Sequence, residues 1–337
     1  MKAQSQAFTT NRRMMMQVSK LFYIEGRSKV QIADALGLSR FKVARLLTEA
    51  HEAGMVSITL NSGAPLPGLS DEVASHLGLV KVHVVEVYGD EKSVRAAVGR
   101  ATGTYLRDAL RDGDVLGIGW GRTLNAMFDN LDHLPQIEIM QLSGRFPGDA
   151  HNSAAELTRR TVALAGGAAS AIPAPFFIDD ARLANALRRQ PEVASVVAGF
   201  NRLTIAVVGI GAVHPRPISV AYSQVPERFT AQVLQSGGVG EVQGNLFAED
   251  GRVVDSRLWR HTLTITPDQL RRVNRVVAAA ADPVKARAVR AVCSSGVLTD
   301  LVVDVELANA LLRLPPAAAP RTATRESDRP GSRPSAR

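Results

Sequence analysis

Hydrophobic residues recur at helical spacing in three successive stretches near the start of the chain, at residues 11–25, 28–37 and 39–54. Ser28 stands where an N-cap is expected, and Gly37 supplies the permissive backbone that ends a helix. Two short helices joined by a tight turn therefore follow a longer one. The pattern predicts a three-helix unit with a core of its own, in the arrangement of a helix-turn-helix.

The third helix of this unit carries most of the side chains that would reach DNA. Val43, Leu46 and Leu47 share one apolar face, which turns the neighbouring basic side chains elsewhere. Such a face can contact phosphates and base edges, although an ordinary helical hairpin with a solvated surface has the same pattern. The candidate DNA-binding residues are Ser28, Gln31, Ser39, Arg40, Phe41, Lys42 and Arg45. The β-rich residues 55–60 predict a wing hairpin or a backing strand.

The pattern changes after residues 61–68, a segment rich in proline and glycine that we interpret as a linker. A short helix at 69–77 is followed by strand-like apolar runs that alternate with helical patterns. The seven runs are residues 82–87, 114–119, 137–142, 168–172, 204–209, 276–280 and 301–305. This alternation predicts a largely parallel α/β sheet covered by helices, in a second domain at 69–314. Residues 315–337, rich in Pro, Ala, Ser and Arg, are expected to be disordered.

The charge of the chain is concentrated at its two ends. Residues 1–60, the predicted head, hold nine Lys or Arg against four acidic side chains, and residues 316–337 hold five against two. These segments account for the whole formal charge of +8, so residues 61–315 are neutral. A neutral body with a basic head is what the release of counterions from DNA phosphates would favour.

Composition narrows the class of protein further. The single cysteine, Cys293, excludes a disulfide framework and is expected to be a small buried hydrophobic residue. The seven histidines show no metal-ligand spacing, and we expect His151 and His261 to be structural or surface residues. The sequence has neither a signal-like segment nor an apolar stretch long enough to span a membrane. We therefore expect a cytoplasmic globular protein without a metal, a cofactor or a membrane association.

A glycine-rich loop is the first candidate site of the second domain. In residues 115–124, VLGIGWGRTL, an apolar strand ends in three glycines, and Thr123 is expected to open a helix. Glycines let the backbone approach a ligand, and N–H groups at a helix N-terminus bind anions, so a phosphate would fit beside Arg122. The glycines could equally serve a simple strand-to-helix turn. A dinucleotide site is not expected, because Glu138, the acid at about the right distance, lies within a strand.

Six motifs follow one another in order along the chain. They are LSRFKVARLLTEAHEAGMV, GIGWGRTL, QLSGRFPG, VVGIGAV, GEVQGNLFAEDGRVV and ADPVKARAVRAVCSSGVLTDLVVDVELANALL. Together they resemble the SorC family of bacterial transcriptional regulators, over about residues 14–312. The resemblance implies a sugar-responsive regulator that binds a double-stranded DNA operator as a homodimer or homotetramer. It also implies an effector domain related to sugar-phosphate isomerases and glucosamine-phosphate deaminases.

The resemblance also assigns site residues, at the carboxyl ends of the sheet strands. Arg122 and Thr123 match the phosphate loop of the family, Glu241 its acceptor of sugar hydroxyls, and Lys285 its phosphate lysine. A lysine that opens a helix is otherwise most often a solvated surface charge. The effector-binding residues that the resemblance implies are Gly119, Gly121, Arg122, Thr123, Ser143, Gly144, Arg145, Glu241 and Lys285.

The chain departs from the family pattern at two places. Arg145 stands where the family usually has a second glycine, and Ala281 and Asp282 stand where it usually has a pair of glycines. These departures indicate an effector whose shape or charge differs from that of the common sugar phosphates. Asp282 in particular would repel a phosphate unless its carboxylate is turned away.

Two other classes of function stay open on the sequence. An enzyme that isomerises or deaminates a sugar phosphate would need a carboxylate or histidine base near the glycine loop, and no such pair stands beside residues 115–124. An architectural DNA-binding protein would not need an α/β domain of this size. We therefore expect a transcriptional regulator without catalytic residues, controlled by a sugar or sugar phosphate.

Overall fold

The computed structural model describes residues 2–145, 154–213, 226–254 and 257–318. Its internal contacts divide the chain into two compact units, Met1–Leu60 and Asn61–Arg337, here called the head and the α/β domain. Within the described ranges, no helix is both long enough and apolar enough to cross a membrane.

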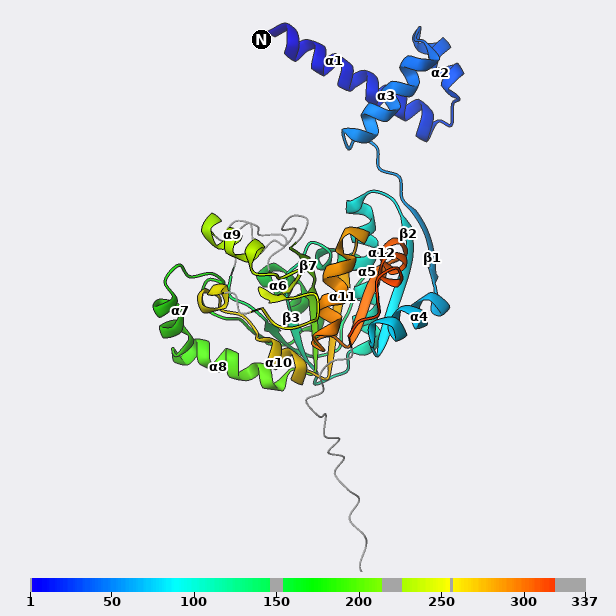
Figure 1. Ribbon diagram of the computed structural model, residues 1–337. Coiled ribbons are helices and arrows are strands. Elements are labelled where there is room, and N and C mark those ends of the chain that lie inside the picture. The colour runs from blue at the N-terminus through cyan, green and yellow to red at the C-terminus, as the bar shows by residue number, and fades with distance from the viewer. Residues whose placement is uncertain (1, 146–153, 214–225, 255–256, 319–337) are drawn as a thin grey trace, which may run out of the picture. The chain divides into compact units, whose positions relative to one another are not determined.

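The head consists of helices packed around a small apolar core (Figure 1). α1 (Lys2–Ser19) continues through the π-helical turn η1 (Lys20–Ile24), and α2 (Lys29–Leu36) is followed by α3 (Arg40–Glu52). All three predicted helices are present, although the first begins well before residue 11. The buried side chains are Met15, Val18, Ile32, Ala33, Val43, Leu46, Leu47 and Ala50.

Local hydrogen bonds explain where the second and third helices begin and end. The Ser28 hydroxyl accepts from the N–H of Gln31 at 3.2 Å, and the Gln31 side-chain oxygen accepts from the N–H of Ser28 at 2.9 Å, which completes a capping box. Gly37 ends α2 with a φ of +65°, a left-handed conformation that glycine adopts most readily. Ser39 then caps α3 by accepting from the N–H of Lys42 at 3.1 Å. These contacts fix the tight turn of the helix-turn-helix.

The predicted wing is wrong. Within residues 2–59 of the described chain no strand forms. The next strand, β1 (Leu60–Pro65), instead joins the edge of the large sheet beside β2 (Lys81–Tyr88). The segment interpreted as a linker is therefore this strand and the start of α4 (Pro67–Leu77). An edge strand tolerates proline and glycine because one row of its N–H groups needs no partner in the sheet.

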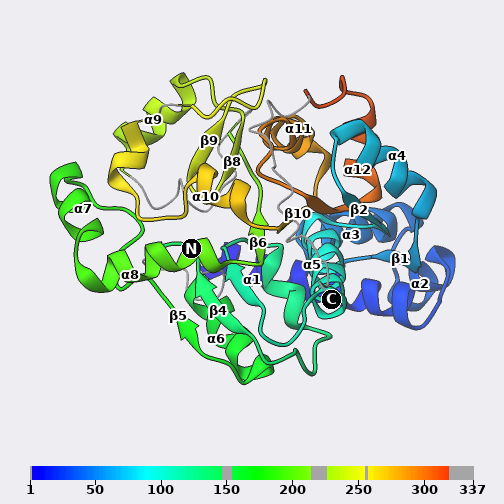
Figure 2. The same cartoon turned by 90° about the horizontal axis from the view of Figure 1, so that it is seen from below.

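An eight-stranded sheet forms the centre of the α/β domain (Figure 2). The strand order is β1-β2-β11-β10-β6-β3-β4-β5, and the pairs from β2 to β5 are parallel. The further strands are β3 (Val115–Ile118), β4 (Glu138–Gln141), β5 (Ala169–Ser170), β6 (Ile205–Gly209), β10 (Arg275–Ala280) and β11 (Asp300–Asp304). Each of the seven predicted runs overlaps a strand of this sheet, which confirms the largely parallel α/β fold.

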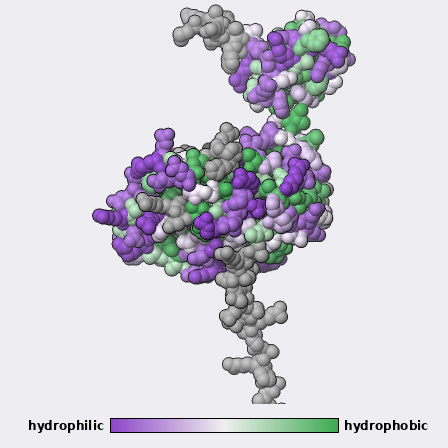
Figure 3. Space-filling model, in the orientation of Figure 1, coloured by the Kyte–Doolittle hydropathy of each residue, from purple (hydrophilic) through white to green (hydrophobic). Residues whose placement is uncertain are grey.

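Helices cover both faces of this sheet, which explains why its central strands are apolar almost throughout. Neighbouring residues of one strand point into different cores: Ala206 packs in the first core and Val207 in the second. The helices that pack on the first core include α4, α11 (Ala286–Ser294) and α12 (Val305–Leu312), and those on the second include α5 (Glu91–Ala109) and α6 (Ala154–Ala165). Cys293 of α11 is buried in the first core, as expected. Hydrophilic side chains predominate on the visible surface of the domain (Figure 3).

A second, antiparallel sheet was not predicted. Its strands are β7 (Gly211–Ala212), β8 (Gly240–Val242) and β9 (Asn245–Phe247), too short for an alternating pattern to appear in the sequence. Because β7 follows β6 almost at once, this sheet lies at the carboxyl end of the parallel strands. The remaining helices are α7 (Ala181–Arg188), α8 (Pro191–Gly199), α9 (Glu227–Gln235), α10 (Pro267–Arg272) and the 3-10 turns η2 (Leu124–Phe128), η3 (Phe200–Arg202), η5 (Arg257–His261) and η6 (Pro283–Lys285).

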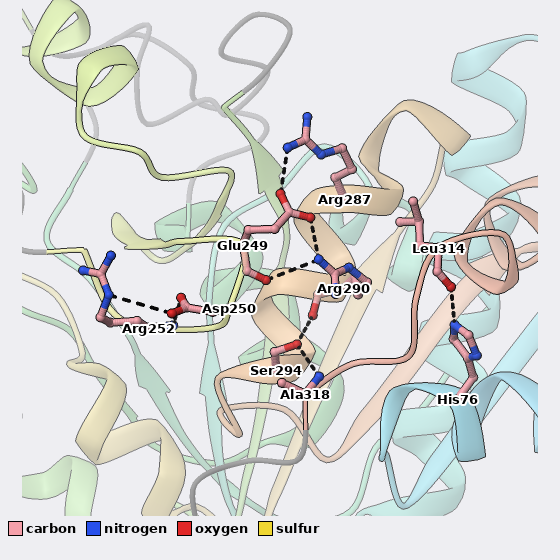
Figure 4. Close-up of polar contacts among 9 residues, drawn as sticks. All are labelled: His76, Glu249, Asp250, Arg252, Arg287, Arg290, Ser294, Leu314 and Ala318. Atoms are coloured by element: carbon pink, nitrogen blue, oxygen red, sulfur yellow. Dashed lines mark hydrogen bonds and ion pairs between the residues drawn. The ribbon is translucent and has the colours of Figure 1, made fainter.

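Ion pairs of Glu249 with Arg287 and Arg290 connect the loop after β9 to α11 (Figure 4). The Glu249 carboxylate accepts from Arg287 at 2.7 Å and from Arg290 at 2.5 Å. Burial disfavours the charged carboxylate, but these two hydrogen bonds outweigh it and lower the pKa of Glu249. These ion pairs thus attach the small sheet to the helix that follows β10.

The first residues of the predicted disordered tail contact the α/β domain. The N–H of Ala318 donates to the hydroxyl of Ser294 at 3.0 Å, so residues 315–318 belong with the α/β domain (Figure 4). The rest of that predicted tail, residues 319–337, lies outside the described residues. His151 lies outside them as well.

Candidate functional site

A pocket opens at the carboxyl ends of parallel strands, where α/β sheets usually bind ligands. Five of its lining residues belong to the predicted effector set: Gly121, Arg122, Thr123, Glu241 and Lys285. The other lining residues were not predicted: Arg95, Trp120, Gly209, Ile210, Gly211 and Ala279. The lining therefore joins segments from β3, β6, β8, β10 and α5 that lie far apart in the sequence.

The glycine loop after β3 forms one wall of this pocket, but not in the predicted conformation. It approaches β6 so closely that a Cβ at Gly209 would lie 3.0 Å from the carbonyl oxygen of Trp120. The helix expected after Thr123 is only the 3-10 turn η2, and the Thr123 side chain makes no cap hydrogen bond. A turn of five residues has little dipole, so it would contribute little positive charge to an anion. The predicted helix is wrong, whereas the anion site stays a prediction that depends mainly on side-chain cations.

Lys285 supplies a buried cation to the pocket. This last residue of η6 is 9% exposed, and its ammonium donates to the carbonyl oxygen of Ile210 at 3.0 Å. Burial, followed by the positive charges of Arg122 and Arg95, lowers the pKa of Lys285 to about 8. The alternative of a solvated surface charge is therefore wrong. An ammonium has three donors, so one backbone partner leaves capacity for an anion.

Two arginines stand beside Lys285. Arg95 reaches the pocket from α5 and donates to the carboxylate of Glu91, one turn earlier in the helix. The same carboxylate oxygen lies 4.0 Å from the guanidinium of Arg122. Arg95 was not predicted, because nothing in the helical pattern distinguishes it from other arginines of the domain. Only the packing of α5 beside the loop brings it to the pocket.

Glu241 brings a carboxylate to the same pocket. It lies in β8 directly opposite Gly211 of β7 and is 2% exposed. Its carboxylate accepts a hydrogen bond from the N–H of Gly244. Because Ile210, the backbone partner of Lys285, immediately precedes Gly211, the start of β7 brings the carboxylate and the ammonium together. An acceptor beside a group of cations suits a ligand with an anionic end and a hydroxyl-bearing end.

Four predicted effector residues lie outside the lining of the pocket. Gly119 precedes it in the loop, and Ser143 is fully buried after β4. The N–H groups of Gly144 and Arg145 donate to main-chain carbonyls at 2.8 and 2.9 Å. The loop after β4 is thus held by backbone hydrogen bonds to other segments, a feature that its sequence motif does not reveal.

Asp282 is turned away from the pocket. Its carboxylate accepts from the N–H of Val284 at 2.9 Å, and its own N–H donates to Asp304 at 3.0 Å. Its φ of +90° lies in the region that favours glycine, which fits the glycines that the family usually has here. Asp282 does not line the pocket, and its negative charge favours the protonated form of Lys285.

The head presents its predicted basic face at the start of α3. Arg40 and Phe41 are exposed, the phenyl ring to 87%, and Lys42 is half-buried. Arg45 is exposed one turn later and pairs with Glu49 at 3.3 Å. The first turn of α3 therefore offers two cations and an aromatic ring on a helix whose opposite face is buried.

The other three candidate DNA contacts have a structural role. Ser28, Gln31 and Ser39 form the caps of α2 and α3. A hydroxyl that accepts a hydrogen bond still has its proton to donate, so these caps are compatible with phosphate contacts.

Carboxylates and histidines are scarce in the pocket. Among the described residues that line it, Glu241 is the one carboxylate and there is no histidine. Across the described ranges, no group of three His, Cys, Asp or Glu side chains is placed to hold a metal ion. His261 has the structural position expected of it, with Nδ1 lying 3.0 Å from the carbonyl oxygen of Ile178 and its ring stacked on Phe177.

Known proteins share this architecture. Residues 67–313 match the family model described as "Putative sugar-binding domain". The erythritol catabolism regulatory protein EryD of Brucella abortus is 29% identical over 88% of this chain and 95% of its own. The deoxyribonucleoside regulator of Bacillus subtilis is 24% identical, over 89% and 97%. The crystal structure of the full-length sorbitol operon regulator SorC from Klebsiella pneumoniae has the same fold, with a TM-score of 0.68, 21% identity and coverage of 90% and 99%.

A helix-turn-helix head followed by an α/β domain of the sugar-binding type defines a class of transcriptional regulators. The family match spans most of the α/β domain, and the relatives match over both units. The chain belongs to the SorC family.

Proposed function

We propose that this chain regulates the transcription of genes for carbohydrate metabolism, and that an anionic sugar or polyol controls its affinity for a double-stranded DNA operator. The observation that carries the proposal is the buried ammonium of Lys285, which shares one pocket with Arg95, Arg122 and Glu241. Burying a cation is unfavourable unless a partner compensates for its lost hydration. A phosphate group would supply that compensation.

The two kinds of polar group in the pocket favour a phosphorylated effector over a neutral one. Lys285, Arg95 and Arg122 can form charge-assisted hydrogen bonds with phosphate oxygens, whereas the Glu241 carboxylate only accepts and so suits hydroxyl groups. A neutral sugar would leave the positive charges of Arg95 and Arg122 beside Glu91 without an anionic ligand. The names of the relatives refer to erythritol, deoxyribonucleosides and sorbitol, which supports an effector of the sugar or polyol class.

On the DNA side, the proposal assigns the first contacts to Arg40 and Lys42. The N-terminal part of a recognition helix enters the major groove, and both residues lie in the first turn of α3. A helix-turn-helix monomer reads one half-site, so we propose that the protein acts as a homodimer or homotetramer on a two-fold operator. Such a regulator acts in the cytoplasm, where the bacterial DNA lies.

An enzymatic role has less support. Isomerisation or deamination of a sugar phosphate requires a positioned base and acid, and the described lining of the pocket offers Glu241 without a second carboxylate or a histidine. The relatives are named as regulators. We therefore propose that binding, without turnover, is the function of the pocket.

The test is the thermal stabilisation of the full chain by ribose 5-phosphate, since a ligand that binds the native state raises the melting temperature. We expect Lys285→Met to weaken this binding by about tenfold to a hundredfold, because a charged hydrogen bond contributes about 1.5 to 3 kcal/mol. Lys92→Met removes an exposed lysine of α5 and is the matched control, expected to bind as the wild type does. Equal stabilisation of wild type and Lys285→Met would contradict the proposal.

A further inference from the structure

Gln243 has a buried side-chain amide for which the described structure provides no hydrogen-bond partner. The residue is 1% exposed, and neither Nε2 nor Oε1 makes a hydrogen bond. Its backbone has a φ of +51°, a left-handed conformation that is unfavourable for glutamine. Folding is opposed by buried amides without partners and by strained backbone, so a residue that combines both calls for a functional explanation.

The Gln243 amide lies next to the pocket on two sides. Gln243 begins the tight turn between β8 and β9, two residues after Glu241, which lines the pocket. On the other side, the amide lies against the backbone of Gly119, where any Cβ would overlap it. Gly119 immediately precedes Trp120, which also lines the pocket. The amide therefore stands between the glycine loop and the strand that carries the carboxylate.

The main chain around this amide is well bonded, in contrast to the side chain. The carbonyl oxygen of Gln243 accepts from Thr264 Oγ1 at 3.0 Å and from Asn245 Nδ2 at 3.3 Å. Thr264 pairs in turn with Ser143, whose buried hydroxyl also lacks a partner in the described structure. Three unsatisfied polar atoms thus gather at the carboxyl ends of β3 and β4, on a rigid support.

We infer that Gln243 is a specificity-determining residue of the effector site, and that its amide reads a hydroxyl group of the sugar or polyol. The inference rests on the proposed function. A hydroxyl both donates and accepts, and so does an amide, whereas phosphate oxygens of the dianion only accept. The ligand class is then a phosphorylated sugar or polyol with free hydroxyls away from its phosphate. The phosphate binds to Lys285 and the arginines, and the hydroxyl-bearing part binds between Glu241 and Gln243.

Access to the amide requires the loop at residues 119–122 to move, because the amide atoms are closed to solvent in the structure. Gly119 and Gly121 make such a movement feasible, since glycine adopts conformations that other residues avoid. Effector binding at Gln243 is thereby coupled to a rearrangement of the wall of the pocket. This coupling gives the effector different contacts in two conformations, which a ligand-controlled switch needs.

The test compares inorganic phosphate with ribose 5-phosphate and glucitol 6-phosphate on the full chain by isothermal calorimetry. Gln243→Met removes both polar atoms at similar volume. Gln243→Asn keeps an amide but withdraws it from the ligand, and asparagine tolerates the left-handed backbone, so this variant folds even if the first does not. We expect both variants to bind the better sugar phosphate at least about tenfold more weakly, and inorganic phosphate within about twofold of the wild type.

Gln141→Met is the matched control, because Gln141 is also buried but donates to the carbonyl oxygen of Ser143 at 2.6 Å. It should leave the ratio of sugar-phosphate to phosphate affinity unchanged. The same unchanged ratio in both Gln243 variants would overturn the inference alone, and would assign the amide to a buried water. Failure of the wild type to bind inorganic phosphate or either sugar phosphate would overturn the proposed function as well.

Discussion

Because of Lys285, both the folding stability of the protein and the binding of an anion in the pocket should depend on pH. Burial and the two arginines lower its pKa from 10.5 to about 8. Between these values the unfolded chain holds a proton that the folded chain has released, so the contribution of Lys285 to folding stability rises with pH in this window. Binding of an anion has the opposite sign, because the anion favours the protonated ammonium.

We therefore predict that affinity for ribose 5-phosphate falls by up to about tenfold as the pH rises from about 7 to about 9. The charge of a phosphate monoester changes little over this range, since its second pKa is near 6. Calorimetric titration at several pH values measures the effect, and Lys285→Met should show a weak and flat profile. A flat profile for the wild type would remove Lys285 from the anion site.

Asp282 offers a test of backbone strain beside the same lysine. Asp282→Ala loses the hydrogen bond to Val284 and keeps the unfavourable φ of +90°, whereas Asp282→Gly loses the bond but relieves the backbone. We predict that the glycine variant is more stable than the alanine variant by about 1 kcal/mol. Urea unfolding of both variants measures the difference. If alanine proves as stable as glycine, the positive φ does not constrain this position.

At the scale of single residues, a site residue can be predicted from the sequence when it stands in a recognisable motif. A residue that reaches the site only through the packing of distant segments cannot be predicted in this way. Glu241 and Lys285 were predicted from GEVQG and DPVK and do line the pocket. Arg95 carries no local signal, because it reaches the pocket only through the packing of α5. Gln243 stands within GEVQG, but the motif does not show that its amide is buried without a partner. For Ser143 the motif was present, but backbone hydrogen bonds hold its loop outside the lining.

At the scale of elements, the contact between α5 and η2 positions the glycine loop. A Cβ at Gly103 would overlap the carbonyl oxygen of Met127, and one at Gly99 would overlap that of Thr123. The two glycines thus let the helix lie directly on the backbone of the loop and of η2. The same approach brings Arg95, one turn before Gly99, to the pocket.

We predict that Gly103→Ala lowers the free energy of unfolding by about 1 to 3 kcal/mol, the usual range for overpacking, and weakens ribose 5-phosphate binding by displacing the loop. Thr104→Ala changes an exposed position of the same helix and serves as the control. Denaturant unfolding and thermal shift together measure both effects. Wild-type stability in Gly103→Ala would mean that the helix and the loop adjust easily to each other.

The predictability of an element depended on its length and on its partners. Seven strands of the large sheet and the three helices of the head could be predicted from apolar patterns and helix caps. The strands β7 to β9 were too short for any pattern. The predicted wing did not form because residues 55–59 have no second strand to pair with, and Leu60 begins β1, a strand of the large sheet.

At the scale of the whole molecule, DNA binding and effector binding are assigned to different parts of the chain. The basic excess of residues 1–60 belongs to the helix-turn-helix, whereas residues 61–315 are neutral and hold the pocket. Salt dependence of DNA binding should therefore reside in the head and effector specificity in the α/β domain. Regulation requires that the two be coupled, so that ligand binding changes the affinity for DNA.

The most direct measurement of that coupling is operator binding by the full chain, followed by fluorescence anisotropy on a duplex selected in vitro, with and without saturating sugar phosphate. We predict an affinity change of about tenfold or more for the wild type, within the usual range of allosteric coupling. Lys285→Met should bind the operator equally well without responding. The double variant Arg40→Ala with Lys42→Ala should bind DNA weakly, with a smaller salt dependence, while still binding sugar phosphate. Operator affinity that is indifferent to every sugar phosphate bound by the wild type would contradict the account.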